Sequence, residues 1–425
     1  MKRKALWISI IGILLIGFVC LFCYRHYIRQ KQIEQKKHTG LVSEDFPVQD
    51  IKHQSKNIYE DAYQTEADNQ LQNMRNNNSY TIEDPLVVWN PYGTNTGSFY
   101  YYGVSEQDSY VVCEVTCNNG SVIKHRLKND SDSGVTKTHE YLITGLAPGL
   151  ENHFSLAFYD AGNNLIHTYQ YTVTLKKDKQ IPAITKVEKG NSKSSLTDGL
   201  FAVLGHDKSK AKNIYYYDNN GICRGKTPLN DYRTDRILTI DGKLVYSYSL
   251  TDIAFVNRLG KVEKTLSLGK YELHHDFMYD EKRNELLCLV NDTDKDTIED
   301  VLISVNIETG KIKKLVDFEK MMKSMRKRSV QRKGGKNTYG GTELDWLHLN
   351  SLDMINDKDA VFSSREESVI IKINNIYENP SIDYLIHSGS LYKGTKYEKL
   401  LLKQKGNFVG HAGQHTITVE KDDTL

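Results

Sequence analysis

LISVNIETG, residues 302–310, is a run of strand-forming residues that ends in a polar turn closed by glycine. The same pattern occurs in NIYYYDNNG (213–221) and IAFVNRLG (253–260), and VIIKINN (369–375) is a degraded fourth copy. A second strand follows the turn, as in KIKKLVDF (311–318). A unit of strand, tight turn and strand that recurs about every 40–50 residues is typical of β-propeller blades. The pattern therefore predicts a β-propeller.

Another β-rich region precedes these repeats. Its strand-like runs, such as HFSLAFYD (153–160), are separated by Gly, Asn, Asp and Pro turns at roughly the 8–12-residue spacing of a β-sandwich. The stretch LITGLAPGLENHFSLAFYDAGNN (142–164) resembles the late strands of fibronectin type III-like domains. We therefore predict an all-β protein with a β-sandwich at 80–177, a polar linker at 178–198 and the β-propeller at 199–425.

The N-terminus carries an apolar segment. Residues 5–24 contain no charge, and about 20 such residues can span the hydrocarbon core of a membrane as a helix. A cleaved signal peptide would need small residues before its cleavage site, where this chain has Val19, Phe22 and Tyr24. We predict a cytoplasmic tip and a single transmembrane anchor within 1–24, followed by a polar, partly helical stalk at 25–79. Basic residues flank both ends of the anchor, so charge does not decide its orientation.

Composition limits the possible partners. The formal net charge is +2, which gives little attraction for nucleic acid, and we expect no nucleic-acid partner. The six cysteines show no disulfide or zinc framework. Cys113 and Cys117 would lie on one face of a strand, too far apart for a disulfide bond without a bulge.

Four short stretches of the repeat region carry residues suited to chemistry: HHDF (274–277), DWLHLNSL (345–352), SSREESVI (363–370) and GQHTITV (413–419). In a propeller, the innermost strands of several blades converge on the central channel. Strict alternation in a strand would also place Trp346, His348 and Asn350 on one side. We therefore expect residues of these stretches to meet although they are remote in sequence.

The residue types in the four stretches favour an anion. Three histidines could bind zinc, but Arg365 would repel a cation, and no ligand pair has a familiar metal spacing. Arginine, asparagine and protonated imidazole together suit a tetrahedral oxyanion such as sulfate or phosphate. A further imidazole could be a nucleophile that accepts a transferred group.

The motifs HHD, DWxHxNS, SSRxxS and GQHT, in this order, closely resemble those of the bacterial arylsulfate sulfotransferases. The resemblance extends from about Tyr80 to the C-terminus. It implies a six-bladed propeller after a small β-sandwich domain. It also implies transfer of a sulfuryl group from a phenolic sulfate to a phenol, without a nucleotide sulfate donor, a cofactor or a metal ion.

By the same resemblance, His415 carries the sulfuryl group as a sulfohistidine. His275 and His348 are the other catalytic residues, and Asn350 and Arg365 hold the sulfuryl oxygens. Alignment on Asp276 favours His275 over His274 as the residue that faces the site. The resemblance also places the catalytic domain outside the cell membrane, where phenolic sulfates and phenols would be met. Whether the chain forms a homodimer is left open.

This chain departs from the family in two respects. Some relatives carry a cysteine pair just before the QH motif, whereas this chain has LLKQKGNFVGHAG (401–413). Relatives are often periplasmic, whereas this chain has the apolar segment of an anchor. Two alternative functions remain: a non-catalytic extracellular propeller that only binds ligands, and a metal-dependent hydrolase of sulfate or phosphate esters.

Two segments of the repeat region carry separate predictions. The basic insertion 318–341 is expected to be a solvated excursion, with an anion-attracting rim as the alternative. The segment GQHTITVEKDDTL (413–425) alternates like a strand and would begin a fifth blade. We therefore predict a truncated chain whose last blades are missing and whose activity is in doubt.

Overall fold

The structure is a computed structural model. It describes residues 48–117, 122–129, 134–175, 177–181, 188, 190–191, 199–205, 212–231, 233–329 and 341–420. The predicted anchor and most of the predicted linker lie outside these residues. In the described part, none of the helices combines the length and the hydrophobicity that crossing a membrane requires. The chain forms two compact units, the first comprising Met1–Val203, Tyr215–Thr227 and Arg258–Gly260, and the second comprising the remainder up to Leu425.

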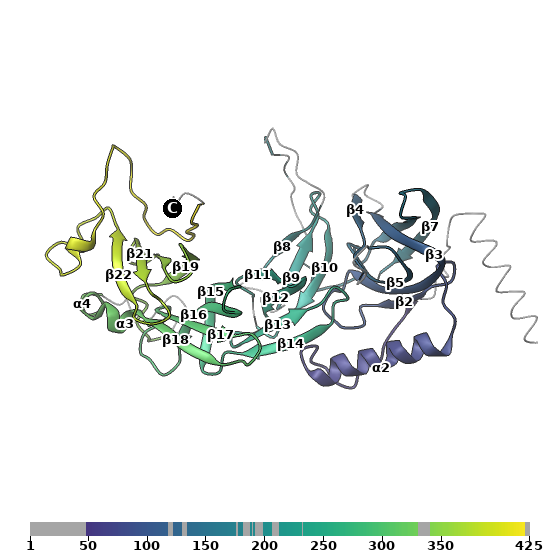
Figure 1. The fold of residues 1–425 in the computed structure, drawn as a ribbon, viewed down its shortest axis with the longest axis horizontal. Coiled ribbons are helices and arrows are strands. Elements are labelled where there is room, and N and C mark those ends of the chain that lie inside the picture. Colours follow the sequence, from purple (N-terminus) through teal and green to yellow (C-terminus); the bar gives the residue numbers. More distant parts are fainter. Residues whose placement is uncertain are drawn as a thin grey trace, which may run out of the picture. The chain divides into compact units, whose positions relative to one another are not determined.

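The first unit is built around one long strand (Figure 1). Strand β3, Ser98–Cys117, pairs with β2 and β5 through its first half and with β4 and β6 through its second half. The other strands of this seven-stranded sheet are β1 (Val48–Gln49), β2 (Leu86–Trp89), β4 (Val122–Arg126), β5 (Thr136–Thr144), β6 (Glu151–Tyr159) and β7 (Leu165–Thr174). One hydrophobic core collects side chains from both halves of β3, including Phe99, Tyr101 and Val115.

The two cysteines of β3 lie as the sequence predicts. Cys113 and Cys117 are both buried on the same face of the strand, and both are free thiols. Burial raises the pKa of Cys113 to about 12. This thiol is therefore a small apolar core residue at neutral pH rather than a reactive group.

The interval predicted as a polar stalk, 25–79, contains a folded part. Helix α2, Asp61–Asn77, buries Gln64, Ala67 and Leu71. The Ala67 and Leu71 side chains pack in a cluster with residues of β2 and β3, including Tyr100. The stalk was predicted as a polar, partly helical segment, and α2 is a helix within it; its few apolar residues recur at helical spacing and form one buried stripe that a count of polar residues does not reveal.

Strands β8 (Phe201–Val203), β9 (Asn213–Tyr217) and β10 (Cys223–Pro228) form a three-stranded sheet. The β10 segment belongs to the first compact unit. Lys226 and Thr96 exchange hydrogen bonds, from Thr96 N to the Lys226 carbonyl (3.1 Å) and from Lys226 N to the Thr96 hydroxyl (3.1 Å). These two hydrogen bonds join the β10 segment to the loop before β3.

The second unit contains three four-stranded antiparallel sheets. Each sheet places consecutive strands side by side. Their strands are β11 (Ile237–Ile240), β12 (Lys243–Ser247), β13 (Asp252–Val256) and β14 (Val262–Ser267); β15 (Tyr271–Asp280), β16 (Glu285–Asp292), β17 (Val301–Asn306) and β18 (Ile312–Asp317); and β19 (Leu349–Met354), β20 (Ala360–Ser364), β21 (Val369–Asn374) and β22 (Ser381–Ile386). The predicted strand, turn, strand units are confirmed as the hairpins β13–β14, β17–β18 and β21–β22.

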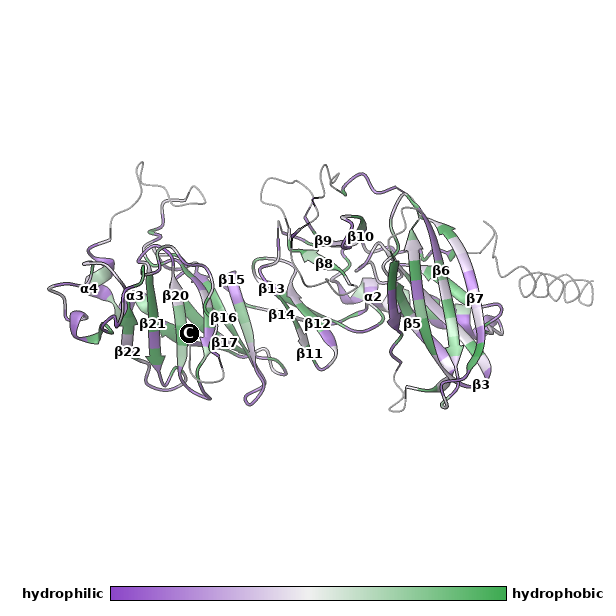
Figure 2. Ribbon diagram, turned by 90° about the horizontal axis from the view of Figure 1, so that it is seen from above, coloured by the Kyte–Doolittle hydropathy of each residue, from purple (hydrophilic) through white to green (hydrophobic). Residues whose placement is uncertain are grey.

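Burial explains why these sheets form. The central strands β16, β17, β20 and β21 are almost continuous apolar runs, seen as green strands in Figure 2. One hydrophobic cluster joins the sheet β11–β14 to the sheet β15–β18. A second cluster joins β16 and β17 to the sheet β19–β22. Burying both faces of a sheet favours such runs over alternation.

The basic insertion is anchored at its start. Helices α3 (Phe318–Met321) and α4 (Lys323–Arg326) follow β18, and Phe318, Met322 and Met325 are buried in the second of these clusters. Residues 330–340 lie outside the described part. A short 3₁₀ helix, η1 (Glu398–Leu400), precedes the C-terminal segment. Residues 411–420 contain no strand, so the prediction of a C-terminal strand is wrong.

Candidate functional site

Seven described non-glycine residues of the second unit adopt left-handed backbone conformations, and three of them are His275 (φ 57°), Glu299 (φ 57°) and His348 (φ 51°). The pairing of β15 with β16 is interrupted between Leu273 and Phe277, and the pairing of β19 with β20 is interrupted between Leu349 and Ser351. Non-glycine residues seldom occupy this region, and such strain clusters at functional sites. The interruptions redirect side chains that regular strands would place elsewhere.

These redirected residues meet. The His275 Nε2 atom lies 3.0 Å from the His348 Nε2 atom, although the two residues are 73 positions apart in the sequence. The Glu299 carboxylate lies 2.5 Å from His348 Nδ1 and 3.7 Å from His275 Nε2. His348 and Glu299 are buried, whereas His275 is partly exposed. An imidazole pair that shares one carboxylate is therefore set at the edge of the core.

His348 is held by a second carboxylate. Both Asp345 carboxylate oxygens lie close to His348 Nδ1, at 3.1 and 3.0 Å. Burial by itself lowers the pKa of His348, but the hydrogen bonds to Asp345 and Glu299 outweigh it and raise this pKa to about 9. Burial also works against the ionised form of Glu299, yet its hydrogen bonds to His275 and His348 keep the pKa of Glu299 well below its usual value. At neutral pH His348 is thus an imidazolium and Glu299 is a carboxylate.

The C-terminal segment docks onto this cluster. The Gln414 side-chain amide donates to the Ser364 and Val369 carbonyls, at 3.0 and 3.1 Å. The Asn350 amide donates to the Gln414 carbonyl at 2.7 Å. Ser351 accepts from Ile417 N at 2.9 Å. The motifs that contain Gln414, Ser364 and Asn350 therefore bind one another, which explains part of their residue pattern.

Docking brings His415 to the imidazole pair. Its ring centroid lies 6.0 Å from that of His275 and 6.3 Å from that of His348. The His415 side chain is exposed. Its Nδ1 lies 3.3 Å from the Gly413 carbonyl, which can only accept, so Nδ1 carries the proton. The Nε2 atom of His415 then holds a lone pair and can act as a nucleophile.

Arg365 lies at the same end of the second unit's last sheet. Its guanidinium is 3.7 Å from the Asp345 carboxylate and 2.6 Å from the Glu366 carboxylate. A Cβ atom placed on Gly413 would meet the Arg365 side chain at 4.0 Å. Arg365 thus links the acidic residue beside His348 to the segment that carries His415. Five predicted residues, His275, His348, Asn350, Arg365 and His415, are therefore gathered in one region, while their roles remain predictions.

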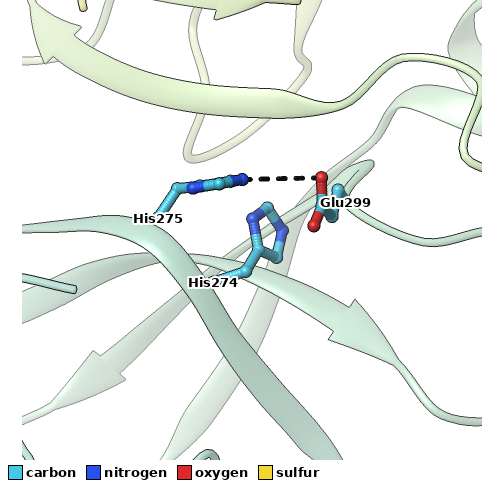
Figure 3. Close-up of side chains that lie close together, drawn as sticks. All are labelled: His274, His275 and Glu299. Atoms are coloured by element: carbon cyan, nitrogen blue, oxygen red, sulfur yellow. Dashed lines mark ion pairs between the residues drawn. The ribbon is translucent and has the colours of Figure 1, made fainter. Parts of the chain in front are cut away.

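His274 also belongs to this region. It is buried beside Glu299, and the ring centroids of His274 and His275 are 5.5 Å apart (Figure 3). Burial lowers the pKa of His274 to about 3, so its imidazole is neutral. The bulge in β15 breaks strict alternation, so both histidines approach Glu299. Alternation of Trp346 with His348 also fails, because Trp346 packs in the core and donates from Nε1 to Asp300.

Sequence reasoning missed Glu299 and Asp345. Asp345 opens the stretch DWLHLN, so its spacing of three residues before His348 was a usable signal. Glu299 lies in the turn between β16 and β17, and its sequence neighbourhood, TIED, resembles many exposed turns. The pairing of β15 to β18 in one sheet brings Glu299 to His274 and His275, and the hydrogen bond from Leu349 N to the Glu299 carbonyl holds it beside His348. A long-range contact of this kind leaves no local pattern.

Fold and site together define a mostly β protein that gathers four imidazoles, a guanidinium and two buried carboxylates at the ends of its sheets. The sequence model of the family Arylsulfotransferase (ASST) matches residues 185–425, more than half of the chain. The chain therefore belongs to the arylsulfotransferase family.

Other comparisons add little. No curated protein matches this chain. Among solved structures, it is similar to KlHsv2 with loop 6CD replaced by a Gly-Ser linker, at 8% identity and a TM-score of 0.26 over 67% of this chain and 75% of that one. A similarity this low supports no argument about fold or function.

Proposed function

We propose that this chain moves a sulfuryl group from an aryl sulfate to a phenol through a sulfohistidine at His415. Family membership supports the reaction class. The observation that carries the proposal is the approach of the His415 ring to within 6.0 and 6.3 Å of the His275 and His348 rings. A nucleophile, a proton donor and positive charge are then close enough to act on one ester group.

In the first half-reaction the His415 Nε2 lone pair attacks the sulfur of the aryl sulfate. The bond between sulfur and the aryl oxygen breaks, and its electron pair goes to the aryloxide. The imidazolium of His348 gives a proton to the aryloxide, which leaves as a phenol. His275 and Arg365 stabilise negative charge on the sulfuryl oxygens. Arg365 reaches this role by exchanging its Glu366 partner for the sulfate.

The second half-reaction reverses these steps with another phenol. The acceptor hydroxyl returns a proton to His348 while its oxygen attacks the sulfur. The bond between His415 and sulfur breaks, which restores the neutral imidazole and releases the new aryl sulfate. Asn350 takes part by holding the Gln414 carbonyl, and through it the position of His415.

Acceptor-dependent release of nitrophenol tests this proposal. The purified full chain is incubated with para-nitrophenyl sulfate, with and without phenol. We expect His415→Ala to abolish the phenol-dependent release, whereas His411→Ala, four residues earlier in the same segment, retains it. Equal rates for the wild-type chain and His415→Ala would contradict the proposal.

The finer architecture is part of this proposal. The three four-stranded sheets and the sheet β8–β10 would be blades of the β-propeller, six-bladed in the family, and the seven-stranded sheet of the first unit would be the fibronectin type III-like sandwich. Consecutive antiparallel strands within each sheet and apolar clusters that join neighbouring sheets support this reading. Both features are expected of stacked blades.

The cellular setting is also proposed from the sequence. Residues 5–24 would anchor the chain, with the catalytic region outside the cell membrane, phenolic sulfates and phenols as its partners and no cofactor. Protease added to intact cells should digest the region after the anchor. Complete protection in intact cells, with digestion after lysis, would show the opposite orientation.

A further inference from the structure

The buried imidazole of His274 has no part in the transfer chemistry proposed above. Its residue is 5% exposed, and neither ring nitrogen has a hydrogen-bond partner among the described residues. The Val290 backbone lies near the ring, but not with hydrogen-bond geometry. A buried polar group without a partner is destabilising and calls for an explanation.

Two neighbouring side chains could bind a metal ion together with the His274 ring. One ligand atom each from His274, His275 and Glu299 lies within 4.8 Å of the other two. Figure 3 shows the His274 ring beside the Glu299 carboxylate, with His275 reaching the same carboxylate from above. The atoms His275 Nε2 and Glu299 Oε2 are already 3.7 Å apart. Three ligands about 2.0–2.1 Å from one tetrahedral ion lie about 3.4 Å apart, so small side-chain rotations suffice.

We propose that His274, His275 and Glu299 form a binding site for a divalent transition-metal ion of the zinc class. Two imidazoles and one carboxylate are the ligand set of several zinc sites that keep a position open. Magnesium and calcium prefer oxygen ligands and fit this set poorly. The second carboxylate of the cluster, Asp345, lies beyond His348 and adds negative charge near the ion.

The consequence for catalysis rests on the proposed function. An ion at this site takes His275 away from the sulfuryl group. It also takes Glu299 away from His348, whose Nδ1 is 2.5 Å from that carboxylate. Zinc therefore inhibits sulfuryl transfer, whereas a metal-dependent hydrolase would lose its activity when the ion is removed.

Direct zinc binding tests the site. The full chain is freed of metal with a chelator, and Zn²⁺ is titrated by calorimetry and by competition with a chromogenic chelator. We expect one strong site in the wild-type chain. His274→Asn should raise its Kd at least tenfold, because even outer partners of a zinc ligand are worth about 10–100-fold. His153→Asn, which changes an exposed histidine of the first unit, is the matched control and should leave the Kd unchanged.

Activity measured in parallel separates the two proposals. Zinc should inhibit wild-type transfer and inhibit His274→Asn at least tenfold less strongly, with circular dichroism showing that both are folded. The metal site would be overturned if the wild-type chain does not bind zinc strongly. It would also be overturned if His274→Asn and a second variant, Glu299→Gln, both leave the Kd for zinc unchanged. Zinc binding that depends on His274 in a metal-free chain without any transfer activity would keep the site and overturn the transferase.

Discussion

At the scale of single residues, hydrogen bonds and burial give three histidines of the site different states. His415 donates from Nδ1 to a backbone carbonyl, which leaves Nε2 free to attack. His348 is held by two carboxylates at Nδ1, so it keeps a proton on Nε2 that it can give away. His274 is neutral because it is buried. The surroundings of the three imidazoles therefore give them different protonation states, although their intrinsic basicity is the same.

Glu299→Gln tests how the proton donor is held. The amide cannot replace the carboxylate beside His348 Nδ1, so proton transfer to the leaving group should become poorer. We expect the transfer rate to fall about 10- to 100-fold, and to fall more for phenyl sulfate than for para-nitrophenyl sulfate, whose better leaving group needs less protonation. Steady-state kinetics with both donors measures this, with the exposed Glu281→Gln as control. An equal loss with both donors would indicate that Glu299 only shapes the site.

His139 in the first unit makes a prediction about pH. It is completely buried, with Ser105 and Ser109 at Nε2 and Tyr141 at Nδ1. Burial lowers its pKa to about 4. Between pH 6.5 and 4 the unfolded chain therefore binds more protons at this residue than the folded chain does, and stability falls as the pH falls.

The full shift corresponds to about 3 kcal/mol of unfolding free energy. We expect the first unit of the wild-type chain to lose thermal stability from pH 7 to pH 4.5 more steeply than His139→Gln does, because the variant lacks the group that titrates. Differential scanning calorimetry at several pH values measures both slopes. Identical slopes would show that His139 titrates normally in the folded chain.

At the scale of elements, close backbone contacts decide where side chains are tolerated. Gly97 lies between β2 and β3, and a Cβ atom there would stand 1.9 Å from the Arg224 carbonyl and 2.5 Å from the Leu146 carbonyl. Because both neighbours are backbone, neither can rotate away. The contact ties the β10 segment to the first unit, beside the hydrogen bonds of Thr96 with Lys226.

Gly97→Ala should therefore destabilise the first unit by about 1–3 kcal/mol, the usual cost of overpacking. Chemical denaturation followed by circular dichroism measures the loss. Gly199→Ala is the control, since a Cβ atom there meets nothing within 4 Å. A change of less than about 0.5 kcal/mol for Gly97→Ala would show that the β10 segment moves apart at little cost.

Some of these elements could be predicted from the sequence and others could not. The hairpins β13–β14, β17–β18 and β21–β22 were predictable because their apolar runs and turn residues are adjacent in the chain. The bulge at His275 and the left-handed conformation of His348 directly before β19 were not, because a single left-handed residue leaves no periodic signal. The buried stripe of helix α2 was hidden by the polar residues around it. The segment 411–420 alternates like a strand but is held to β19 and β20 by side-chain hydrogen bonds instead.

At the scale of the whole molecule, the sequence could predict which stretches form the site, but it could not predict how their side chains are arranged. The stretches that contain His275, His348, Arg365 and His415 could be chosen because their residue types suit one oxyanion. Glu299 could not be chosen, because its contacts with the histidines exist only after β15 to β18 have paired and the segment before β19 has bonded to the turn that carries Glu299. The assembled site therefore depends on the fold of the second unit more than on any one motif.

The central claim is that His415 carries the sulfuryl group, and trapping that intermediate tests it most directly. The full chain is mixed with ³⁵S-labelled para-nitrophenyl sulfate without acceptor, quenched in base and digested. The account predicts an acid-labile, base-stable label on the peptide that contains His415, discharged when phenol is added before quenching. The claim would be contradicted by a label that persists in His415→Ala or that lies on another residue. It would also be contradicted if transfer proceeds and no label is found.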